Sequence, residues 1–329
     1  MQFTCLKRRS VVTLLGVAAV ALPCTSGAQQ LPVVGFVNGG SFIARDATAF
    51  RKGLNEAGYI ESQNVTVEYH WLEGQFDRLP SLMADLVHRR AAVIATPAGN
   101  LATIAAKAAT QTIPIVFGVG EDPVKLGLVA SIARPGGNLT GINFFQQEVH
   151  AKRLGLLREL VPKSVRLAVL INPENAPTAE TTLRELPQAA RSLGFQPEIL
   201  KASTNAEVEA AFDTLARNGA DALFVTSDIF FSSQGVQFAT LAARHRIPAT
   251  YPNRAIVEAG GLMSYAADRT EMYRQVGVYT GRVLGGAKPA DLPVLQSTKL
   301  EFVINLKAAR ALGIEVPNAI QLMADELID

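Results

Sequence analysis

Cysteine is almost absent from this chain, and both copies, Cys5 and Cys24, lie near the N-terminus. The surrounding segment has the layout of an export signal: basic residues at 7–9, an apolar run from Val11 to Leu22, and small residues that end at Ala28. We expect this 28-residue signal peptide to be cleaved after Ala28, which would leave 301 residues without cysteine. Disulfides, thiol catalysis and cysteine-ligated metals would then be excluded together.

A long hydrophobic run is also missing, because the run from Val11 to Leu22 is too short to span a membrane. Two alternatives for this segment stay open. Cys24 could be retained as the acylated residue of a lipoprotein, although Pro23 fits poorly where a small residue is preferred. The Arg8-Arg9 pair also leaves a twin-arginine export route open.

Neither sign of charge dominates the sequence. The first 28 residues carry three of the 31 Lys and Arg and none of the 29 Asp and Glu, so the cleaved chain would have a net charge of −1 with neutral histidines. No basic block remains that would indicate nucleic-acid binding. Because 48% of the residues are hydrophobic and no low-complexity tract occurs, the composition predicts a globular protein with room for two lobes.

The common catalytic signatures are absent as well. The sequence has no GxxxxGK[ST], HExxH or GxSxG motif, and the pair Gly118 and Gly120 runs into Glu121-Asp122-Pro123, so a dinucleotide fingerprint is incomplete. The adjacent carboxylates Glu121 and Asp122 do not by themselves define acid–base chemistry. The four histidines lack metal-ligand spacing: His70, His88, His150 and His245. We therefore expect neither an enzyme nor a bound cofactor or metal.

What the sequence does contain is an internal repeat. Four landmarks recur in one order, at offsets of 134, 136, 130 and 134 residues. They are an apolar run ending at Asn38 and again at Asn172, a helix-ending Gly58 and Gly194, Ala92–Thr96 and Ala222–Thr226, and Ile113-Pro114 and Ile247-Pro248. Glycine suits a helix end because it adopts the left-handed conformation without a Cβ clash. The joint pattern predicts two similar βαβ lobes.

Each lobe is predicted to alternate strands with helices, and right-handed crossovers then give a parallel sheet covered on both faces. In the first lobe, strands are expected at 33–37, 65–69, 92–95, 114–118 and 140–144, and helices at about 44–57, 76–89 and 99–109. The second lobe follows a helix at 148–160. Its strands are expected at 166–171, 196–200, 221–225 and 248–250, and its helices at 178–193, 206–217 and 234–245.

The tail adds strands at 262–265 and 300–304 and helices at 268–284 and 306–312. We expect one of these strands in each sheet. Residues 29–144 and about 259–296 would then form the N-terminal lobe, and residues 145–258 and about 297–329 the C-terminal lobe. The chain would cross between lobes near 144, 258 and 297, and three crossings would make a hinge that bends without unfolding either lobe.

The stretch from Ile113 to Phe145 predicts a binding edge. A buried strand around Val116 is followed by the loop Gly120–Pro123 and by a helical pattern that starts at Pro123. Open α/β sheets bind ligands at the carboxyl ends of their strands, and a helix beginning there directs free N–H groups toward the ligand.

Several long motifs resemble one protein family. They are Phe50–Leu54 with Gly58-Tyr59, Asp77–Pro80, Ile113–Phe117, Asp122–Val124 with Gly127–Val129, Arg134–Asn138 with Thr140-Gly141, Gly260–Tyr265, Lys288–Pro293 and Ile304–Leu306. In these motifs, and over nearly the whole chain after residue 28, the sequence resembles exported substrate-binding proteins of ABC transporters, in the group related to tryptophan- and tyrosine-binding components. The resemblance implies a type I periplasmic-binding fold, a periplasmic monomer that closes on a small molecule, and an inner-membrane ABC permease as partner.

The resemblance also suggests a ligand class. It points to an aromatic or branched amino acid, followed by other small carboxylates or aromatic acids. A periplasmic sensory module that presents its closed form to a receptor kinase is the alternative function, and an exported enzyme is a third. Neighbouring genes for a permease and an ATPase would favour transport over sensing, and turnover in a metabolite pool would reveal an enzyme.

Ligand-binding side chains are expected where the strands end. Ser41, Thr96 and the amides near Gly120 are our candidate donors to a ligand carboxylate, and Asn143 and Asn172 end strands at the same edges. Ser41 and Thr96 could instead only cap helices.

Asp228 is our candidate for binding a ligand amine, because a shielded carboxylate needs a positive partner. It could instead only cap the next helix. Asp122 or Glu121 could accept the amine from the opposite lobe, although Asp122 before Pro123 suits a helix start. Tyr251 and Tyr265, which end strands and carry polar tips, lead the candidates for an aromatic wall, followed by Phe42, Phe144, Phe145 and Phe230.

Overall fold

The computed structural model describes residues 31–144 and 146–329. The predicted export signal and Phe145 lie outside the described residues. The first lobe contains β1 (Val33–Asn38), α1 (Ala44–Glu56), β2 (Thr66–Trp71), η1 (Phe76–Arg78), α2 (Leu79–His88), β3 (Val93–Thr96), α3 (Asn100–Ala109), β4 (Ile115–Val119) and β5 (Leu139–Asn143).

The second lobe follows α4 (Gln146–Leu160). It contains β6 (Arg166–Ile171), α5 (Ala176–Ser192), β7 (Gln196–Lys201), α6 (Asn205–Asn218), β8 (Ala222–Val225), α7 (Ile229–Ser233), α8 (Gly235–His245), β9 (Ala249–Tyr251), α9 (Arg254–Glu258) and β10 (Met263–Ala267). The tail contains α10 (Arg269–Leu284), η2 (Pro289–Asp291), β11 (Leu295–Gln296), β12 (Leu300–Asn305), α11 (Leu306–Ala311), α12 (Asn318–Met323) and β13 (Glu326–Ile328).

The two sheets have the same central strand order, which confirms the repeat. The first sheet is ordered β11-β5-β4-β3-β1-β2 and the second β13-β12-β10-β9-β8-β6-β7. From β2 to β5 and from β7 to β10, every neighbouring pair is parallel. The repeat therefore extends to β5 and β10, beyond the four sequence landmarks.

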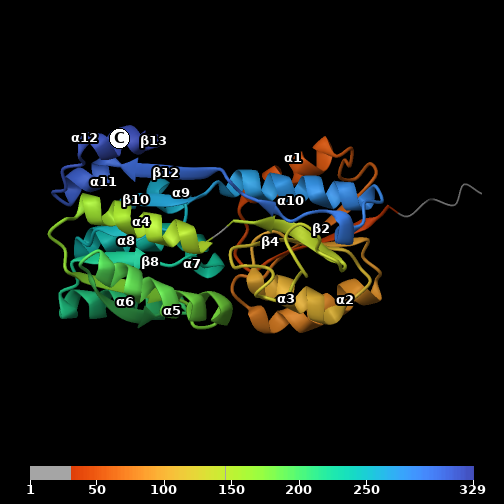
Figure 1. Cartoon of the computed structure of the whole chain (residues 1–329), viewed down its shortest axis with the longest axis horizontal. Helices are drawn as coiled ribbons and strands as arrows, with labels where there is room; N and C mark the ends of the chain where they lie inside the picture. Colours follow the sequence, from red (N-terminus) through yellow and green to blue (C-terminus); the bar gives the residue numbers. More distant parts are fainter. Residues whose placement is uncertain (1–30, 145) are drawn as a thin grey trace, which may run out of the picture. The chain divides into compact units, whose positions relative to one another are not determined.

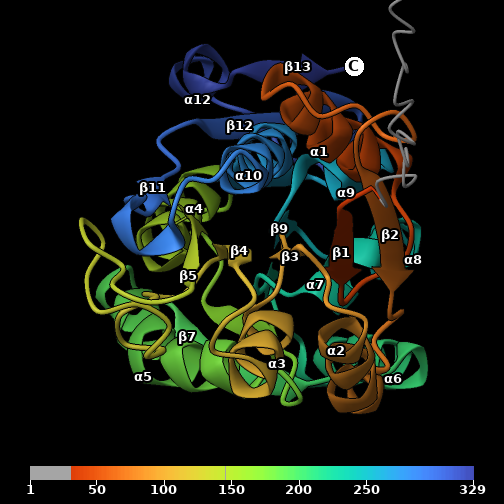
Figure 2. The same cartoon turned by 90° about the vertical axis from the view of Figure 1, so that its right-hand side faces the viewer.

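Both faces of each sheet are covered, as the apolar runs predict. In β1, Val34 and Phe36 face one core cluster and Val37 the other, because successive side chains point to opposite faces. Helices α1 and α10 complete the first cluster, and α2 and α3 the second. Figure 2 shows the strands of the first sheet in a row between these two helix layers. In the second lobe, α4, α5, α11 and α12 cover one face, and α6 to α9 cover the other.

The lobes exchange one helix each. After β5 the chain leaves the first lobe, and α4 packs on the second sheet; after β10 it returns, and α10 packs on the first sheet (Figure 1). Two glycines allow α10 to contact α1 backbone to backbone. A Cβ on Gly53 would overlap the carbonyl group of Arg274, and one on Gly277 would overlap that of Phe50.

The predicted division of the tail strands is wrong. Strand β10 pairs with β9 in parallel and with β12 in antiparallel orientation, so both strands belong to the second sheet. The short β11 joins the first sheet instead, beside β5. The middle crossing therefore falls at Asp268, between β10 and α10, and not near 258. The reason is the repeat itself, because β10 occupies the position that β5 holds in the first lobe.

The predicted helix at Pro123 is also wrong. Residues 123–127 form a turn in which the N–H of Gly127 bonds to the carbonyl of Val124 and the N–H of Leu128 to that of Pro123. Gly127 adopts a left-handed conformation, with φ 66°, which ends the helical pattern after one turn. Sequence reasoning also missed α7, α9, α12, β11 and β13, which are all short. In the described part of the chain, no helix has the length and apolarity needed to cross a membrane.

Candidate functional site

A cavity of about 880 Å³, including the part that opens to solvent, lies between the two lobes. Residues that follow the carboxyl ends of β3, β4, β8 and β9 line it, as do the starts of several helices. The lining residues are Phe76, Ala98, Gly99, Asn100, Leu101, Gly120, Phe144, Val149, Asn175, Thr178, Ser227, Asp228, Ile229, Ser232, Pro252, Asn253, Ala266, Ala267, Arg269 and Met272. The carboxyl edges of the strands are therefore where the cavity forms, as the sequence predicted.

Two helices begin at the cavity without a side-chain cap. The N-cap residue of α3 is Gly99 and that of α5 is Asn175, and neither side chain accepts a hydrogen bond from its own helix. The first N–H groups of a helix have no intrahelical partner and carry partial positive charge. Since α3 belongs to the first lobe and α5 to the second, each lobe offers backbone donors that favour a carboxylate.

Asp228 places a buried carboxylate in the cavity wall; the residue is 6% exposed. Its Oδ1 accepts hydrogen bonds from Nδ2 of Asn172 at 3.0 Å and from the N–H groups of Phe230 and Phe231, and its Oδ2 accepts one from Nδ2 of Asn175 at 2.9 Å. The capping role considered from the sequence is thus confirmed for α7. Each carboxylate oxygen has about two acceptor sites, and Oδ2 uses only one of them, so Oδ2 can accept another donor.

Burial raises the pKa of Asp228 above its usual 3.8, although hydrogen bonds from Asn172 and Asn175 favour the ionised form. No salt bridge joins Asp228 to a cation of the described residues. A cationic group in the cavity would therefore stabilise this carboxylate.

Three amide atoms of the lining residues are buried without a hydrogen-bond partner among the described residues. They are Oδ1 of Asn100, Oδ1 of Asn175 and Nδ2 of Asn253. The opposite end of each amide is used: Nδ2 of Asn100 donates to Oγ1 of Thr178 in the other lobe at 3.2 Å, Nδ2 of Asn175 donates to Asp228, and Oδ1 of Asn253 caps α9. A buried polar atom without a partner costs about 1–3 kcal/mol, which a polar ligand would relieve.

The one lining arginine is already paired. Arg269 donates to both carboxylate oxygens of Asp46, at distances from 2.6 to 3.1 Å, and to the hydroxyl of Tyr273 at 2.9 Å. Tyr273 in turn accepts a hydrogen bond from Asn38 at 2.6 Å. This network ties α10 to α1 and β1, and it neutralises Arg269 at the cavity wall.

Two basic side chains of α4, His150 and Arg153, lie beneath the cavity wall. Nε2 of His150 is 3.2 Å from Oγ of Ser227, and Arg153 donates to the carbonyl of Val225 at 2.6 Å while its guanidinium stacks on Phe224 at 4.1 Å. Arg153 is fully buried, with Nε and Nη1 lacking a hydrogen-bond partner among the described residues, and burial lowers its pKa to about 9. Burial, with the nearby Arg153 charge, also lowers the pKa of His150 well below 6.5.

Two of the predicted site residues, Gly120 and Asp228, line the cavity. Asn172 lies behind Asp228 and holds its carboxylate. Asn143 is buried and donates to the carbonyl of Glu121 at 2.6 Å. Asp122 accepts hydrogen bonds from the N–H groups of Val124 and Lys125 in the turn that replaces the predicted helix.

The other predicted residues lie outside the lining. Ser41 is partly buried in the loop before α1, and Thr96 is fully buried with its hydroxyl 2.8 Å from that of Thr103. Tyr251 is fully buried in a core of the second lobe, and Tyr265 packs edge-on against Phe302. Of the aromatic alternatives, Phe144 lines the cavity, whereas Phe42 is 63% exposed and Phe230 belongs to the second-lobe core.

Sequence reasoning missed Phe76, Asn100, Asn175, Arg269 and Met272, which all line the cavity. Asn100 and Asn175 lie at helix starts, each four residues past a strand end. A search for polar residues at the first turn of each helix after a strand would have found both. Arg269 and Met272 gave no such signal, because α10 reaches the first lobe only through the exchange of helices.

The sequence matches the model of one protein family, ABC transporter substrate binding protein, over residues 30–328. A curated relative, the tyrosine-binding protein of Clostridioides difficile (strain R20291), is 26% identical over 269 residues, which are 81% of this chain and 76% of the relative.

Two solved structures share the fold. The ABC domain from Streptococcus pneumonia in complex with L-Trp is 24% identical, with a TM-score of 0.82 over 91% of this chain and 100% of that one. A conserved domain protein of Vibrio cholerae is 26% identical, with a TM-score of 0.83 over the same shares. The two helix-covered, mostly parallel sheets thus have the type I periplasmic-binding fold. Because the family model spans nearly every residue that the structure describes, the chain belongs to the family of ABC transporter substrate-binding proteins.

Proposed function

We propose that this chain is the extracytoplasmic solute-binding component of an ABC importer and that it closes its lobes on an amino acid, aromatic or branched. The observation that carries the proposal is the cavity, where a buried carboxylate with spare acceptor capacity lies among amide atoms without partners. The relatives named as tyrosine-binding and as a complex with L-Trp support the ligand class.

The ligand carboxylate is assigned to the uncapped starts of α3 and α5. Gly99 and Gly120 carry no side chain that would keep a ligand from the backbone, and both line the cavity. Each helix start contributes free N–H groups, and because one belongs to each lobe, the carboxylate would bridge the lobes.

The ligand ammonium is assigned to Oδ2 of Asp228, with Oδ1 of Asn100 and Oδ1 of Asn175 as further acceptors. Asn100 comes from the first lobe and the other two from the second. An ammonium group has three N–H donors, which matches these three acceptors in number. Their spread over both lobes would make the closed form bind more tightly than the open one, which is what ligand-driven closure requires.

The ligand side chain is assigned to the apolar part of the cavity. Phe76 and Phe144 offer aromatic faces, and Ile229, Pro252 and Met272 complete the apolar surface. Aromatic rings pair favourably with one another, and a thioether packs well against a ring edge. This composition suits an indole, phenol or branched aliphatic group.

The cellular setting belongs to the same proposal. The first 28 residues would direct export and be cleaved after Ala28, and the released monomer would deliver its ligand to a permease in the inner membrane. Substrate-binding proteins of this family work outside the cytoplasm and are not enzymes, so we assign no catalytic role to Asp228 or to the Ser227–His150 pair.

A thermal-shift screen of the twenty amino acids and of aromatic acids without an amine tests the ligand class. We expect stabilisation by L-tryptophan, L-tyrosine or a branched amino acid, and little by indole-3-propionate or 4-hydroxyphenylpropionate, which lack the ammonium group. Equal stabilisation by an amino acid and its amine-free analogue would overturn the ammonium assignment.

Calorimetry on Asp228→Asn tests the residue itself. Asparagine can keep the cap on α7 through its oxygen but loses the charge, so we expect affinity for the amino acid to fall about 10- to 100-fold, as for a lost charge-assisted hydrogen bond. Asp122→Asn is the matched control, because Asp122 also accepts two backbone N–H groups but lies outside the cavity lining. Unchanged affinity in Asp228→Asn would remove Asp228 from the site.

A further inference from the structure

Ile229 has neighbours in both lobes. It begins α7 of the second lobe and lines the cavity, yet its side chain also packs against a core cluster of the first lobe, the one that contains Phe36 and Tyr273. Few positions could sense the ligand and the opposite lobe at once. A change at Ile229 can therefore affect both the cavity and the contact between the lobes.

The first-lobe contact is a pair of glycines just after β1. A Cβ on Gly40 would lie 3.0 Å from Cγ1 of Ile229 and 3.3 Å from its carbonyl oxygen, and one on Gly39 would lie 3.2 Å from Cγ2 of Ile229. Neither glycine has a positive φ, so the backbone conformation does not require glycine there. Space is limited instead: at Gly40 a Cβ would be tight against Ile229, and at Gly39 it would also lie 2.6 Å from Cε1 of Phe76.

The position of Ile229 is fixed by its neighbours in sequence. Oδ1 of Asp228 accepts the N–H groups of Phe230 and Phe231, and both phenylalanines are buried in the core of the second lobe. The turn that carries Ile229 is thus held by the same carboxylate that we assign to the ligand ammonium. The first-lobe side is held as well, since the N–H of Gly40 donates to Oδ1 of Asn38 at 2.8 Å.

We propose that Ile229 is the positioning residue that couples ligand binding to lobe closure. The Gly39-Gly40 turn is the surface of the first lobe against which its side chain packs. The inference rests on the proposed function, because it gives the cavity a ligand. Seating Ile229 removes apolar surface from water only when the lobes meet, so it stabilises the closed form selectively. A closed form that is less populated lowers the apparent affinity by the same factor.

The binding test is a double-mutant cycle with Gly40→Ala and Ile229→Ala, using L-tryptophan and L-tyrosine as probes in calorimetry. Gly40 does not line the cavity, and the atom nearest to its new methyl group would be Cγ1 of Ile229 at 3.0 Å, followed by the carbonyl oxygen of Ile229 at 3.3 Å and Oδ1 of Asn38 at 3.4 Å. We expect Gly40→Ala to weaken binding about tenfold, which is in the range of an overpacked contact. In the Ile229→Ala background, where the space has been freed, Gly40→Ala should change affinity less than about twofold.

Gly137→Ala is the matched control, because a Cβ there meets nothing within 4 Å and its φ is not positive. Thermal unfolding without ligand should show that the Gly40→Ala lobes fold as in the parent protein. If the effects of Gly40→Ala and Ile229→Ala multiply, or if Gly40→Ala binds as tightly as Gly137→Ala, the coupling role of Ile229 is overturned.

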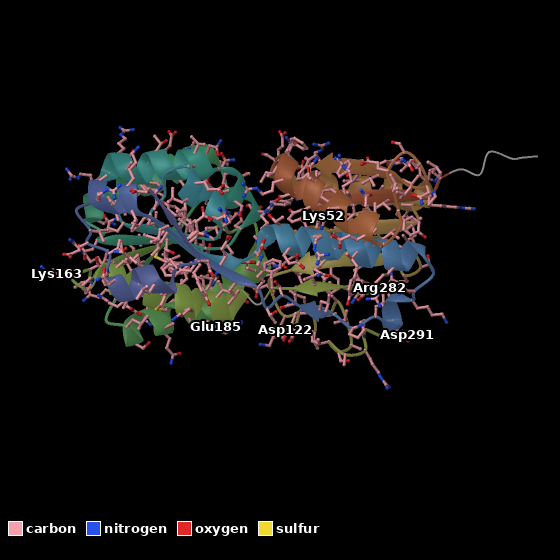
Figure 3. The ribbon with its side chains drawn as sticks, turned by 90° about the horizontal axis from the view of Figure 1, so that it is seen from above. Lys52, Asp122, Lys163, Glu185, Arg282 and Asp291 are labelled. Carbon is pink, nitrogen blue, oxygen red and sulfur yellow. The ribbon has the colours of Figure 1, made fainter. Side chains whose placement is uncertain are left out.

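A distance measurement separates this inference from the proposed function. Lys52 of α1 and Lys163, after α4, are exposed and lie on different lobes (Figure 3), and Cys5 and Cys24 are the only native cysteines. Spin labels at Lys52→Cys and Lys163→Cys, with Cys5 and Cys24 changed to serine where present, report closure with and without ligand. We expect Gly40→Ala and Ile229→Ala each to lower the fraction of molecules at the closed distance, and Gly40→Ala to lower it little further when Ile229 is already alanine.

If neither amino acid binds the parent protein, the proposed ligand class fails, but the label distances of the unliganded variants still test the Ile229 contact. If both amino acids bind and Gly40→Ala does not change the distances between the spin labels, the proposed function stands and the coupling role of Ile229 fails.

Discussion

Asn38 and Asn172 hold equivalent positions at the ends of β1 and β6, and they differ in one hydrogen bond. In both, Oδ1 accepts the backbone N–H two residues later, that of Gly40 at 2.8 Å and that of Glu174 at 3.0 Å. Nδ2 of Asn38 donates to Tyr273, whereas Nδ2 of Asn172 donates to the cavity carboxylate Asp228. The repeat therefore conserves the turn in both lobes, and only the second lobe uses it to support a charged group.

The same division holds after β3 and β8. At the 130-residue offset of the repeat, Ala98 in the first lobe corresponds to Asp228 in the second, and both line the cavity. The first lobe contributes small and apolar residues, a helix start and the amide of Asn100, and the second contributes the buried carboxylate. Duplication thus supplied two similar frames, while the chemistry of binding diverged between them.

The two exchanged helices, α10 and α4, differ in whether their buried arginine has a carboxylate partner. Arg269 at the start of α10 is paired with Asp46, whereas Arg153 of α4 is fully buried without a carboxylate partner among the described residues. Removing one member of a buried ion pair leaves an uncompensated buried charge, which destabilises the protein. Replacing a buried charge that has no partner by an apolar group can instead stabilise the protein.

The largest expected effect follows from this pair of arginines. Arg269→Met should lower the free energy of unfolding by about 3 kcal/mol, because Asp46 stays buried without its partner. Arg153→Met should leave the stability unchanged or raise it by about 1 kcal/mol. It keeps the contact with Phe224 and removes a buried charge with two nitrogens that have no partner among the described residues, which offsets the lost hydrogen bond to the carbonyl of Val225. Urea denaturation of the two variants measures both. Equal destabilisation would show that Arg153 has a partner that matters to folding.

An intermediate effect is expected from making the lobes alike. Ala98→Asp would place a second carboxylate in the cavity wall without the amide donors that hold Asp228, at a site that is 8% exposed. We expect a loss of about 2 kcal/mol in the free energy of unfolding and the loss of amino-acid binding. Ile104→Asp is the control on α3, the helix that follows Ala98, because Ile104 is 37% exposed and should tolerate the charge. Retained binding in Ala98→Asp would mean that the first-lobe wall does not need to be uncharged.

The smallest effect is a pH dependence confined to the second lobe. Because burial raises the pKa of Asp228 above 3.8, the folded state takes up a proton more readily than the unfolded state. The contribution to stability is therefore full below pH 3.8 and is lost as the pH rises through the raised value. On acidification through that window, the unfolding free energy of the parent protein should therefore rise relative to that of Asp228→Asn.

Ligand affinity should have the opposite pH dependence, because only the ionised carboxylate attracts an ammonium group. Titrations with L-tryptophan or L-tyrosine from pH 7 toward pH 4 should show binding to the parent protein weakening, while the residual binding of Asp228→Asn changes little. If the differences between the parent protein and Asp228→Asn in unfolding free energy and in ligand affinity do not change with pH, Asp228 is not the titrating group.

Much of the fold could be predicted because it follows from local patterns. Apolar runs such as Leu167–Ile171 are covered on both faces, and their strand identity is visible in the sequence. The Pro123 helix failed because Gly127, a residue that can either sit in a helix or end it, ends it here. Strand β10 was assigned to the wrong sheet because its apolar pattern carries no information about which lobe it will join.

The site was predicted only in part, for a similar reason. Asp228 and Gly120 follow strand ends directly, so a rule about strand ends finds them. Thr96 also ends a strand, but its hydroxyl is hydrogen-bonded to that of Thr103. Tyr251 ends a strand as well, and its side chain lies in the core of the second lobe. Whether a polar side chain at a strand end faces a ligand or its own lobe depends on one rotation of the backbone, which the residue type does not specify.

The sequence by itself determined that the protein has two similar α/β lobes, a binding edge at the carboxyl ends of the strands and no usable cysteine after residue 24, because periodicity, repeats and composition are local properties. Only the tertiary structure decided that α4 and α10 exchange lobes, that Asn100 and Arg269 line the cavity, and that the side chain of Ile229 packs against Gly40. The contact between Gly40 and Ile229 joins residues 189 positions apart in the chain, and that between Phe50 and Gly277 residues 227 apart. They depend on how two separately folded sheets are packed together, and no local pattern encodes that packing.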